Sequence, residues 1–311
     1  MQVFVAGASG ALGSRLVRQL IDRGHEVIGT VHSASGADRV QALGAKPITL
    51  DLLDAYAVRD AVLVSRPDAI VHQATALAGA GFGRSLDRTF AATNRLRTEG
   101  TDALLAAARE AGTPRIVAQS YAPYRYAREG GPVKTEDDAL DAAPPPKTQQ
   151  TYAAMTYLDR AVTAAGGTAL RYGGFYGAAN DGLVTPVRKR QFPIVADGGG
   201  IMSFIHLDDA AAATALAVEQ DHPGIYNIVD DEPAPVREWL PVLADALGAK
   251  PPRNAPRWLA RLFAGEAAVV MGTEARGASN AKAKRELAWT LRYPSWREGF
   301  PAAYPSLQDS A

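Results

Sequence analysis

The first part of the chain alternates short apolar runs with stretches in which apolar residues recur at helical spacing. Residues 2–6 form an apolar run that Gly7 ends, and the apolar residues between 12 and 21 then share one helical face. The same alternation predicts strands at 26–31, 47–50, 68–72 and 115–119, with helices near 54–64 and 86–111. Strands that alternate with helices are typical of right-handed βαβ units, so the pattern predicts an α/β fold with a doubly wound parallel sheet.

Residues 121–148 interrupt this alternation. The segment is rich in proline, glycine, tyrosine and charged residues, which predicts a long surface loop that is either functional or disordered. Beyond it the pattern is mixed, with strands expected at 168–172, 203–205 and 224–228, and helices near 149–165, 207–219, 235–247 and 279–288. We therefore expect a first domain over 1–172 and a smaller mixed α/β domain over most of 173–311, with about 203–230 returning to the first.

The amino-acid composition excludes several kinds of site and of binding partner. The 311 residues include no cysteine, which excludes a disulfide framework, thiolate zinc sites, iron–sulfur clusters and a cysteine nucleophile. The 33 Lys and Arg residues balance 33 Asp and Glu residues, which argues against a nucleic-acid or anionic-membrane partner. The N-terminus lacks the features of a signal peptide, and no apolar run approaches the ~20 residues of a membrane span, so we expect a cytoplasmic protein.

A glycine-rich turn connects the first predicted strand to the first predicted helix. Its sequence is Gly7-Ala8-Ser9-Gly10-Ala11-Leu12-Gly13. Gly7 permits a tight turn, Gly10 lets a pyrophosphate approach the backbone, and Gly13 allows close packing of the helix on the strand. The amides at the start of the helix then face the phosphates, so this turn predicts a dinucleotide site.

The end of the second predicted strand bears on the choice of dinucleotide. A carboxylate there would bind the 2′-hydroxyl of NAD, whereas a cationic or polar group suits the 2′-phosphate of NADP. The residues at this point are Thr30-Val31-His32-Ser33, with no acid among them, and Arg39 follows on the next predicted helix. His32 and Ser33 therefore favour NADP, with NAD still possible, and a solvated turn is the alternative interpretation.

Taken with the glycine turn, later segments resemble the short-chain dehydrogenase/reductase superfamily, in its extended or atypical branch of NAD(P)-dependent epimerases, dehydratases and reductases. The matching segments are Asp51-Leu52, His72-Gln73-Ala74-Thr75-Ala76, Asn94, Leu170-Arg171-Tyr172-Gly173-Gly174-Phe175-Tyr176-Gly177, Phe204-Ile205-His206-Leu207-Asp208-Asp209 and Tyr226-Asn227-Ile228. The resemblance implies a Rossmann-type sheet with a smaller substrate-binding domain. It also implies cofactor contacts from Gly7, Ser9, Gly10, Ala11, Leu12, Gly13, His32, Ser33, Asp51, Leu52, Gln73, Ala74, Thr75, Asn94, Tyr172 and Gly173.

The same resemblance implies the catalytic residues and reveals one departure. Carbonyl reduction in the family uses a tyrosine whose pKa is lowered by a lysine four residues later, and a serine or threonine that binds the substrate oxygen. Ser120 and Tyr152 match these positions, but Thr156 stands where the lysine is expected; it could still bond a ribose. A cation about 4 Å away contributes roughly 4 kcal/mol at an effective dielectric of about 20, equivalent to about three pKa units, so the departure matters.

Three explanations of this departure stay open. Another cation replaces the lysine, and Lys134, Lys147 and Arg160 are the neighbouring candidates. Alternatively, oxidised nicotinamide alone supplies the positive field, or the chemistry differs. Tyr152 is correspondingly either the catalytic acid/base or a residue of the pocket wall.

Aromatic residues cluster after Ser120. Tyr121, Tyr124 and Phe175 are the predicted substrate contacts. A phenol of this cluster, which includes Tyr126, could replace the missing function, although lining of an apolar pocket is the simpler interpretation.

Two further pairs of polar residues are not expected to be catalytic or to bind a metal. Asp208 and Asp209 resemble a helix cap. His206 and His222 lack the spacing of metal ligands, so no metal is expected.

These features lead to a first hypothesis and two alternatives. The first is an NADPH-dependent oxidoreductase that reduces a carbonyl or an activated double bond on a small organic substrate. The alternatives are a sugar-nucleotide epimerase or dehydratase that recycles its cofactor, and a non-catalytic NADP-binding sensor or regulator. A homodimer through the helices near 86–111 and 149–165 is expected by analogy with the superfamily.

Overall fold

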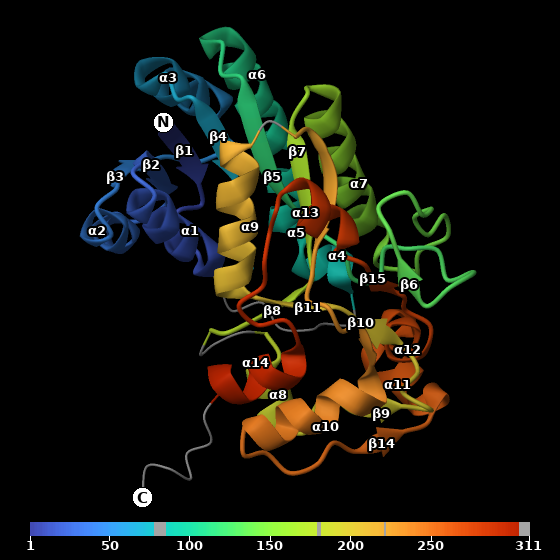
Figure 1. Cartoon of the computed structure of the whole chain (residues 1–311). Helices are drawn as coiled ribbons and strands as arrows, with labels where there is room; N and C mark the ends of the chain where they lie inside the picture. Colours follow the sequence, from blue (N-terminus) through green and yellow to red (C-terminus); the bar gives the residue numbers. More distant parts are fainter. Residues whose placement is uncertain (78–84, 179–181, 221, 305–311) are drawn as a thin grey trace, which may run out of the picture.

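The computed structural model describes residues 1–77, 85–178, 182–220 and 222–304. One seven-stranded sheet dominates it, in the order β12-β7-β5-β4-β1-β2-β3, and every neighbouring pair is parallel (Figure 1). The strands are β1 (Gln2–Ala6), β2 (Glu26–Val31), β3 (Lys46–Thr49), β4 (Ala69–His72), β5 (Arg115–Tyr121), β7 (Thr168–Tyr172) and β12 (Gly224–Ile228). The predicted doubly wound parallel sheet is confirmed.

Apolar residues alternate between the two faces of this sheet. On β1, Val3 and Val5 face one layer of helices, while Phe4 and Ala6 face the other. The first layer holds α1 (Ala11–Asp22), α2 (Ala34–Ala42) and α9 (Leu207–Glu219), and the second holds α3 (Ala55–Ser65), α6 (Thr101–Ala111) and α7 (Gln149–Ala164). Helices thus cover both faces, which is why the strands are apolar on each side.

The single helix predicted over 86–111 is wrong. The segment divides into α4 (Leu86–Thr89), α5 (Ala91–Arg95), the π-helical turn η1 (Leu96–Gly100) and α6. At η1 the carbonyl of Leu96 accepts a hydrogen bond from His72 Nε2, 3.1 Å away at the end of β4. The π-turn therefore packs against the carboxyl end of a central strand, and such turns occur frequently at functional sites.

The segment 121–148 differs from the predicted surface loop in its first part. Arg125 and Tyr126 are 1% and 2% exposed, and Tyr126 forms an isolated antiparallel bridge with Leu140. The chain turns inward because these polar side chains find partners there; Tyr126 Oη, for example, donates to Asn227 Oδ1 at 2.6 Å. Further along, β6 (Val133–Lys134) pairs in parallel with β15 (Gly277–Ala278).

After β7 the chain builds a smaller lobe, which lies at the bottom of Figure 1. Its core is aromatic, with Phe204, Trp239, Trp296 and Phe300 buried against one another. The remaining helices are α8 (Val184–Arg188), α10 (Val236–Ala246), α11 (Arg257–Ala264), α12 (Glu266–Thr273), α13 (Ala281–Glu286) and α14 (Trp296–Ala303), of which α13 packs against β12. The short strands are β8 (Gly174–Tyr176), β9 (Ile194–Val195), β10 (Ile201–Met202), β11 (Phe204–His206), β13 (Ala234–Pro235) and β14 (Asn254–Ala255).

The segment from β11 to β12 links the lobe to the sheet. β11 pairs in parallel with β8, α9 packs against α1, and β12 forms the edge of the large sheet. His206 Nδ1 accepts a hydrogen bond from Asp208 N at 3.1 Å, so His206 caps α9; the expected cap by Asp208 or Asp209 is wrong. In the part of the chain that the structure describes, no helix is both long and apolar enough to cross a membrane.

Candidate active site

The glycine turn lies where the sequence predicts it, between β1 and α1. Gly7 has a φ of 87°, and a Cβ added there would lie 2.7 Å from Ala74 Cα. A Cβ on Gly13 would overlap the Gly7 carbonyl oxygen. Only glycine therefore fits either position. α1 then begins after Gly10 without a side-chain cap, so its first amides are open to an anion.

The region beyond β2 is polar and exposed. Ser33 Oγ accepts a hydrogen bond from Gly36 N at 3.2 Å and so caps α2, while His32 is exposed beside it. After β3, Asp51 is exposed and Leu52 is buried. His32, Ser33, Asp51 and Leu52 are the residues predicted for the adenosine end of the dinucleotide site.

At the end of β4, Gln73 and Tyr172 are brought together. Gln73 Nε2 donates to Tyr172 Oη at 3.1 Å, and Tyr172 Oη also lies 2.6 Å from Thr214 Oγ1. The Tyr172 hydroxyl is therefore engaged inside the core, whereas the buried Gln73 Oε1 has no hydrogen-bond partner among the described residues. The Phe175 ring centroid lies 5.3 Å from that of Tyr172, beside the buried Gly173.

The cradle and the unpartnered Gln73 oxygen together fit a bound dinucleotide. A buried acceptor without a partner calls for a donor from a ligand or from water, and it lies next in sequence to Ala74, against which Gly7 is packed. Thr75 follows on the same segment and is half-buried.

Ser120 meets an arginine that the sequence does not mark as functional. Arg125 Nη1 donates to Ser120 Oγ at 3.0 Å and to the Tyr121 carbonyl at 3.1 Å. Arg125 Nη2 donates to Thr156 Oγ1 at 3.3 Å. Arg125 is thus a cation that lies beside both Ser120 and Thr156, the residue at the lysine position.

The proposed replacements for the lysine do not make these contacts. Lys134 Nζ donates to the Glu129 carbonyl at 2.7 Å and to Asp138 Oδ1 at 3.3 Å. Within the described residues, neither Lys147 nor Arg160 is hydrogen-bonded to Ser120 or Thr156. Of the three open explanations, replacement by another cation gains a candidate that the sequence analysis did not name, because the turn after β5 brings the guanidinium of Arg125 to Ser120 and Thr156.

Arg125 is held by a buried ion-pair network. Its Nη2 lies 2.9 Å from Asp159 Oδ2, and Arg171 Nε lies 2.9 Å from the same oxygen. The side chains of Arg125 and Asp159 are 1% and 3% exposed. Burial lowers the pKa of Arg125, which remains paired with Asp159. Such a network fixes the guanidinium in place, since moving it away would break its buried bond to Asp159.

Tyr152 is hydrogen-bonded to the turn that follows β5. Its hydroxyl donates to the Tyr124 carbonyl, and Tyr124 has a φ of 65°, in the left-handed region. Burial raises the pKa of Tyr152 above its ordinary value, and burial also raises the pKa of Tyr121 to about 12. Asn94, a predicted cofactor contact, donates from Nδ2 to Thr151 Oγ1 at 3.1 Å.

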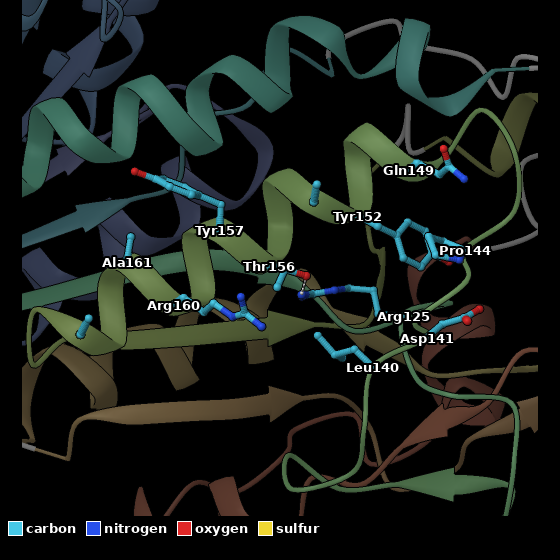
Figure 2. Close-up of a pocket in the computed structure, with 12 residues that line it drawn as sticks. Arg125, Leu140, Asp141, Pro144, Gln149, Tyr152, Thr156, Tyr157, Arg160 and Ala161 are labelled. Carbon is cyan, nitrogen blue, oxygen red and sulfur yellow. Dashed lines mark hydrogen bonds between the residues drawn. The ribbon is translucent and has the colours of Figure 1, made fainter.

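A cavity of about 740 Å³ lies along α7, and Figure 2 shows its lining. Arg125, Tyr152 and Thr156 are among its lining residues. Its other lining residues are Leu140, Asp141, Pro144, Gln149, Ala153, Tyr157, Arg160, Ala161 and Ala164. Arg125 and Thr156, at the position of the missing lysine, therefore border this cavity. Within the described ranges, no cluster of His, Asp and Glu suits a metal ion.

Sequence reasoning missed Arg97, Arg125, Thr151 and Asp159. Arg125 stands among the three tyrosines of the 121–126 stretch, and a charge within such an aromatic cluster was the available signal. Arg97 and Asp159 lie on predicted helices, where charged residues are usually solvated; their burial comes from tertiary packing.

Comparison with known proteins agrees with this architecture. The profile of the NAD dependent epimerase/dehydratase family matches residues 3–229. A 3-diazoavenalumate denitrifying reductase of a Streptomyces species is 42% identical over 96% of this chain and 99% of the relative. A 2-alkyl-3-oxoalkanoate reductase of Stenotrophomonas maltophilia is 32% identical over 80% of this chain and 76% of its own.

A solved structure is similar over nearly the whole chain. The UDP-glucose 4-epimerase of Thermus thermophilus in complex with NAD has a TM-score of 0.74 and 27% identity, with 98% of each chain covered. The chain belongs to the NAD dependent epimerase/dehydratase family, in the extended branch of the short-chain dehydrogenases/reductases, and is an NAD(P)-dependent enzyme of the oxidoreductase type.

Proposed function

We propose that the protein is an NADPH-dependent reductase of small organic acids, acting on a carbonyl or another electrophilic π-bonded group. The observation that carries the proposal is the 3.0 Å contact between Arg125 Nη1 and Ser120 Oγ. Because Ser120 Oγ accepts from the guanidinium, its own proton is free to be donated to a substrate atom.

The cofactor supplies the hydride when it is bound. The open amides at the start of α1, the tight turn at Gly7 and the free Gln73 Oε1 are the groups that would hold it. A preference for NADPH is supported by Ser33 and Arg39, which are exposed beyond β2, and by the absence of acid from residues 30–33.

The residues of this chain stabilise charge rather than abstract a proton. Ser120 Oγ donates a hydrogen bond to the atom that becomes negative as reduction proceeds, and the fixed charge of Arg125 stabilises that atom through Ser120. A solvent water supplies the proton that converts this anion into the neutral product. Tyr152, whose hydroxyl is bonded to the Tyr124 carbonyl, then holds the loop rather than acting as the acid. This assignment also explains why Thr156 can stand at the lysine position.

The substrates named in the two relatives support the chemical class. One name describes a diazo compound and the other a 3-oxo compound, and both are written as carboxylates. A reducible π-bonded electrophile on an organic acid is common to the two. For this chain we propose the same class and leave the carbon skeleton open.

The test is a cofactor titration followed by a substrate screen. We expect tighter binding of NADPH than of NADH, and loss of the reduced-nicotinamide absorbance with keto acids, aldehyde acids or diazo acids. Conversion of UDP-glucose to its epimer without net cofactor oxidation would instead support the epimerase. Tight NADPH binding without turnover of any class would support the sensor, and either result would overturn the reductase.

A further inference from the structure

Arg97 is a buried arginine on the π-turn η1. It is 6% exposed, and its Nε has no hydrogen-bond partner among the described residues. Its guanidinium makes a long hydrogen bond, 3.5 Å from Nη1 to Asn94 Oδ1. Its surroundings therefore leave most of its donor capacity unused.

No carboxylate of the described residues forms an ion pair with Arg97. The neighbouring buried acid, Asp159, is already shared by Arg125 and Arg171. Three buried guanidinium groups thus accompany this one buried carboxylate, and Arg97 is the one that does not touch it.

The guanidinium keeps its charge in this environment. Burial lowers the pKa of Arg97 to about 10, and the nearby charge of Arg125 acts in the same direction. At neutral pH the group is still protonated, so a positive charge is retained in a place that disfavours it. Buried charges are ordinarily paired, and an unpaired one at the carboxyl edge of a sheet points to an anion that arrives with a ligand.

The position of Arg97 connects it with the groups of the proposed reaction. Its partner Asn94 bonds Thr151 Oγ1, in the first turn of α7 and adjacent to Tyr152. Its charge acts on the phenol of Tyr121, the residue after Ser120. η1 also packs against α7 and meets the end of β4 through Leu96. Arg97 therefore lies on the side of Ser120 where β4, β5 and α7 converge.

We infer that Arg97 is the anchor for an anionic group of the substrate, a carboxylate, which it holds while Ser120 and Arg125 act on the electrophilic group. The inference rests on the proposed function for the identity of the ligand, since the cofactor also carries anions. Its test must therefore separate the substrate carboxylate from the cofactor phosphates.

The experiment measures binding and needs no turnover. Calorimetric titrations of the full chain with cinnamate and with the neutral cinnamamide, each with and without NADP⁺, compare the wild type with Arg97→Met and Arg97→Lys. Arg95→Met is the matched control, because Arg95 is exposed on α5 and pairs with Glu99. We expect the Kd of the wild type for the acid to be at least about tenfold lower than its Kd for the amide. A charge-assisted hydrogen bond from Arg97 to the carboxylate would produce a difference of this size.

The variants give distinct outcomes. Arg97→Met should remove the preference for the acid, Arg97→Lys should keep part of it, and Arg95→Met should leave it unchanged. Equal binding of acid and amide by the wild type, or no binding of either, would overturn the inference. A tenfold loss of NADPH affinity in Arg97→Met would also overturn it, by assigning the charge to the cofactor.

Unfolding of the same variants separates a ligand role from a structural one. Arg97→Met removes an unpaired buried charge, so we expect it to resist urea as well as or better than the wild type. A clear loss of stability would mean that Arg97 supports the fold. If cinnamate binding depends on Arg97 while the substrate screen shows no reduction, only the proposed function fails.

Discussion

Arg125 Nη2 lies 3.3 Å from Thr156 Oγ1, so a guanidinium from the turn after β5 reaches the helical position where the superfamily places a lysine. The same guanidinium bonds Ser120 Oγ, which links the helix position to the end of the strand. A buried positive charge therefore lies beside Ser120 and Thr156, and it also acts on Tyr152, whose pKa burial nevertheless raises above its ordinary value.

Replacing Arg125 tests whether its charge is needed for reduction. We expect Arg125→Met to lower kcat/KM by about a hundredfold or more, because a fixed cation near the developing charge is lost. Arg125→Lys should recover part of that loss. Arg125→Met also removes a buried charge-assisted hydrogen bond to Asp159, which keeps Arg171 as its partner, so we expect a loss of about 2 kcal/mol of unfolding free energy, measured by urea unfolding alongside the kinetics. Arg109→Met, on the exposed end of α6, is the control and should change neither quantity.

Removing the Ser120 hydroxyl separates catalysis from cofactor binding. We expect Ser120→Ala to lower kcat by roughly a hundredfold, the cost of one oxyanion donor, while the Kd for NADPH stays unchanged. Ser65→Ala, on α3, should leave both parameters as they are. An unaltered kcat in Ser120→Ala would remove Ser120 from the chemistry.

Local pattern and tertiary packing explain which features of the fold and site were predictable. The strands, the glycine turn and the polar end of β2 were predicted because each depends on neighbours in sequence. The identity of the substitute cation was not, because Arg125 meets Asp159 and Thr156 only after the turn folds against α7. The π-turn at η1 was equally hidden, since its residues fit an ordinary helical pattern.

The glycine turn gives a prediction with an internal control. Gly7→Ala and Gly24→Ala both place alanine at a positive φ, 87° and 82°, and so share a strain of about 1 kcal/mol. A Cβ on Gly7 meets Ala74 backbone atoms at 2.7 Å, whereas one on Gly24 meets nothing within 4 Å. We expect Gly7→Ala to weaken dinucleotide binding at least tenfold and Gly24→Ala to leave it intact. Equal binding by both would show that the Gly7–Ala74 packing does not shape the cofactor site.

His72 makes stability depend on pH. Burial lowers its pKa from 6.5 to about 4, so the unfolded chain binds the proton more readily between these values. Stability contributed by neutral His72 is therefore present above pH 6.5 and is lost as the pH falls toward about 4. This pKa shift corresponds to a loss of roughly 3 kcal/mol of unfolding free energy across the window. Urea unfolding at a series of pH values measures it.

The matching variant keeps the hydrogen bond but removes the titration. Gln at position 72 can still donate to the Leu96 carbonyl, so His72→Gln should flatten the pH dependence in this window. His222→Gln, at an exposed position, should not. A slope that persists in His72→Gln would assign it to other groups.

The choice between NADPH and NADH can be tested without disturbing the fold. Ser33 caps α2 through its Oγ, and aspartate is as good a cap, so Ser33→Asp should preserve the helix. The new carboxylate would repel a 2′-phosphate and accept from a 2′-hydroxyl. We therefore expect the Kd for NADPH to rise tenfold or more while that for NADH falls or stays level. Gln41→Glu adds the same charge at the far end of α2 and should leave the ratio of the two Kd values unchanged; if Ser33→Asp leaves it unchanged as well, the 2′-phosphate is not bound at this turn.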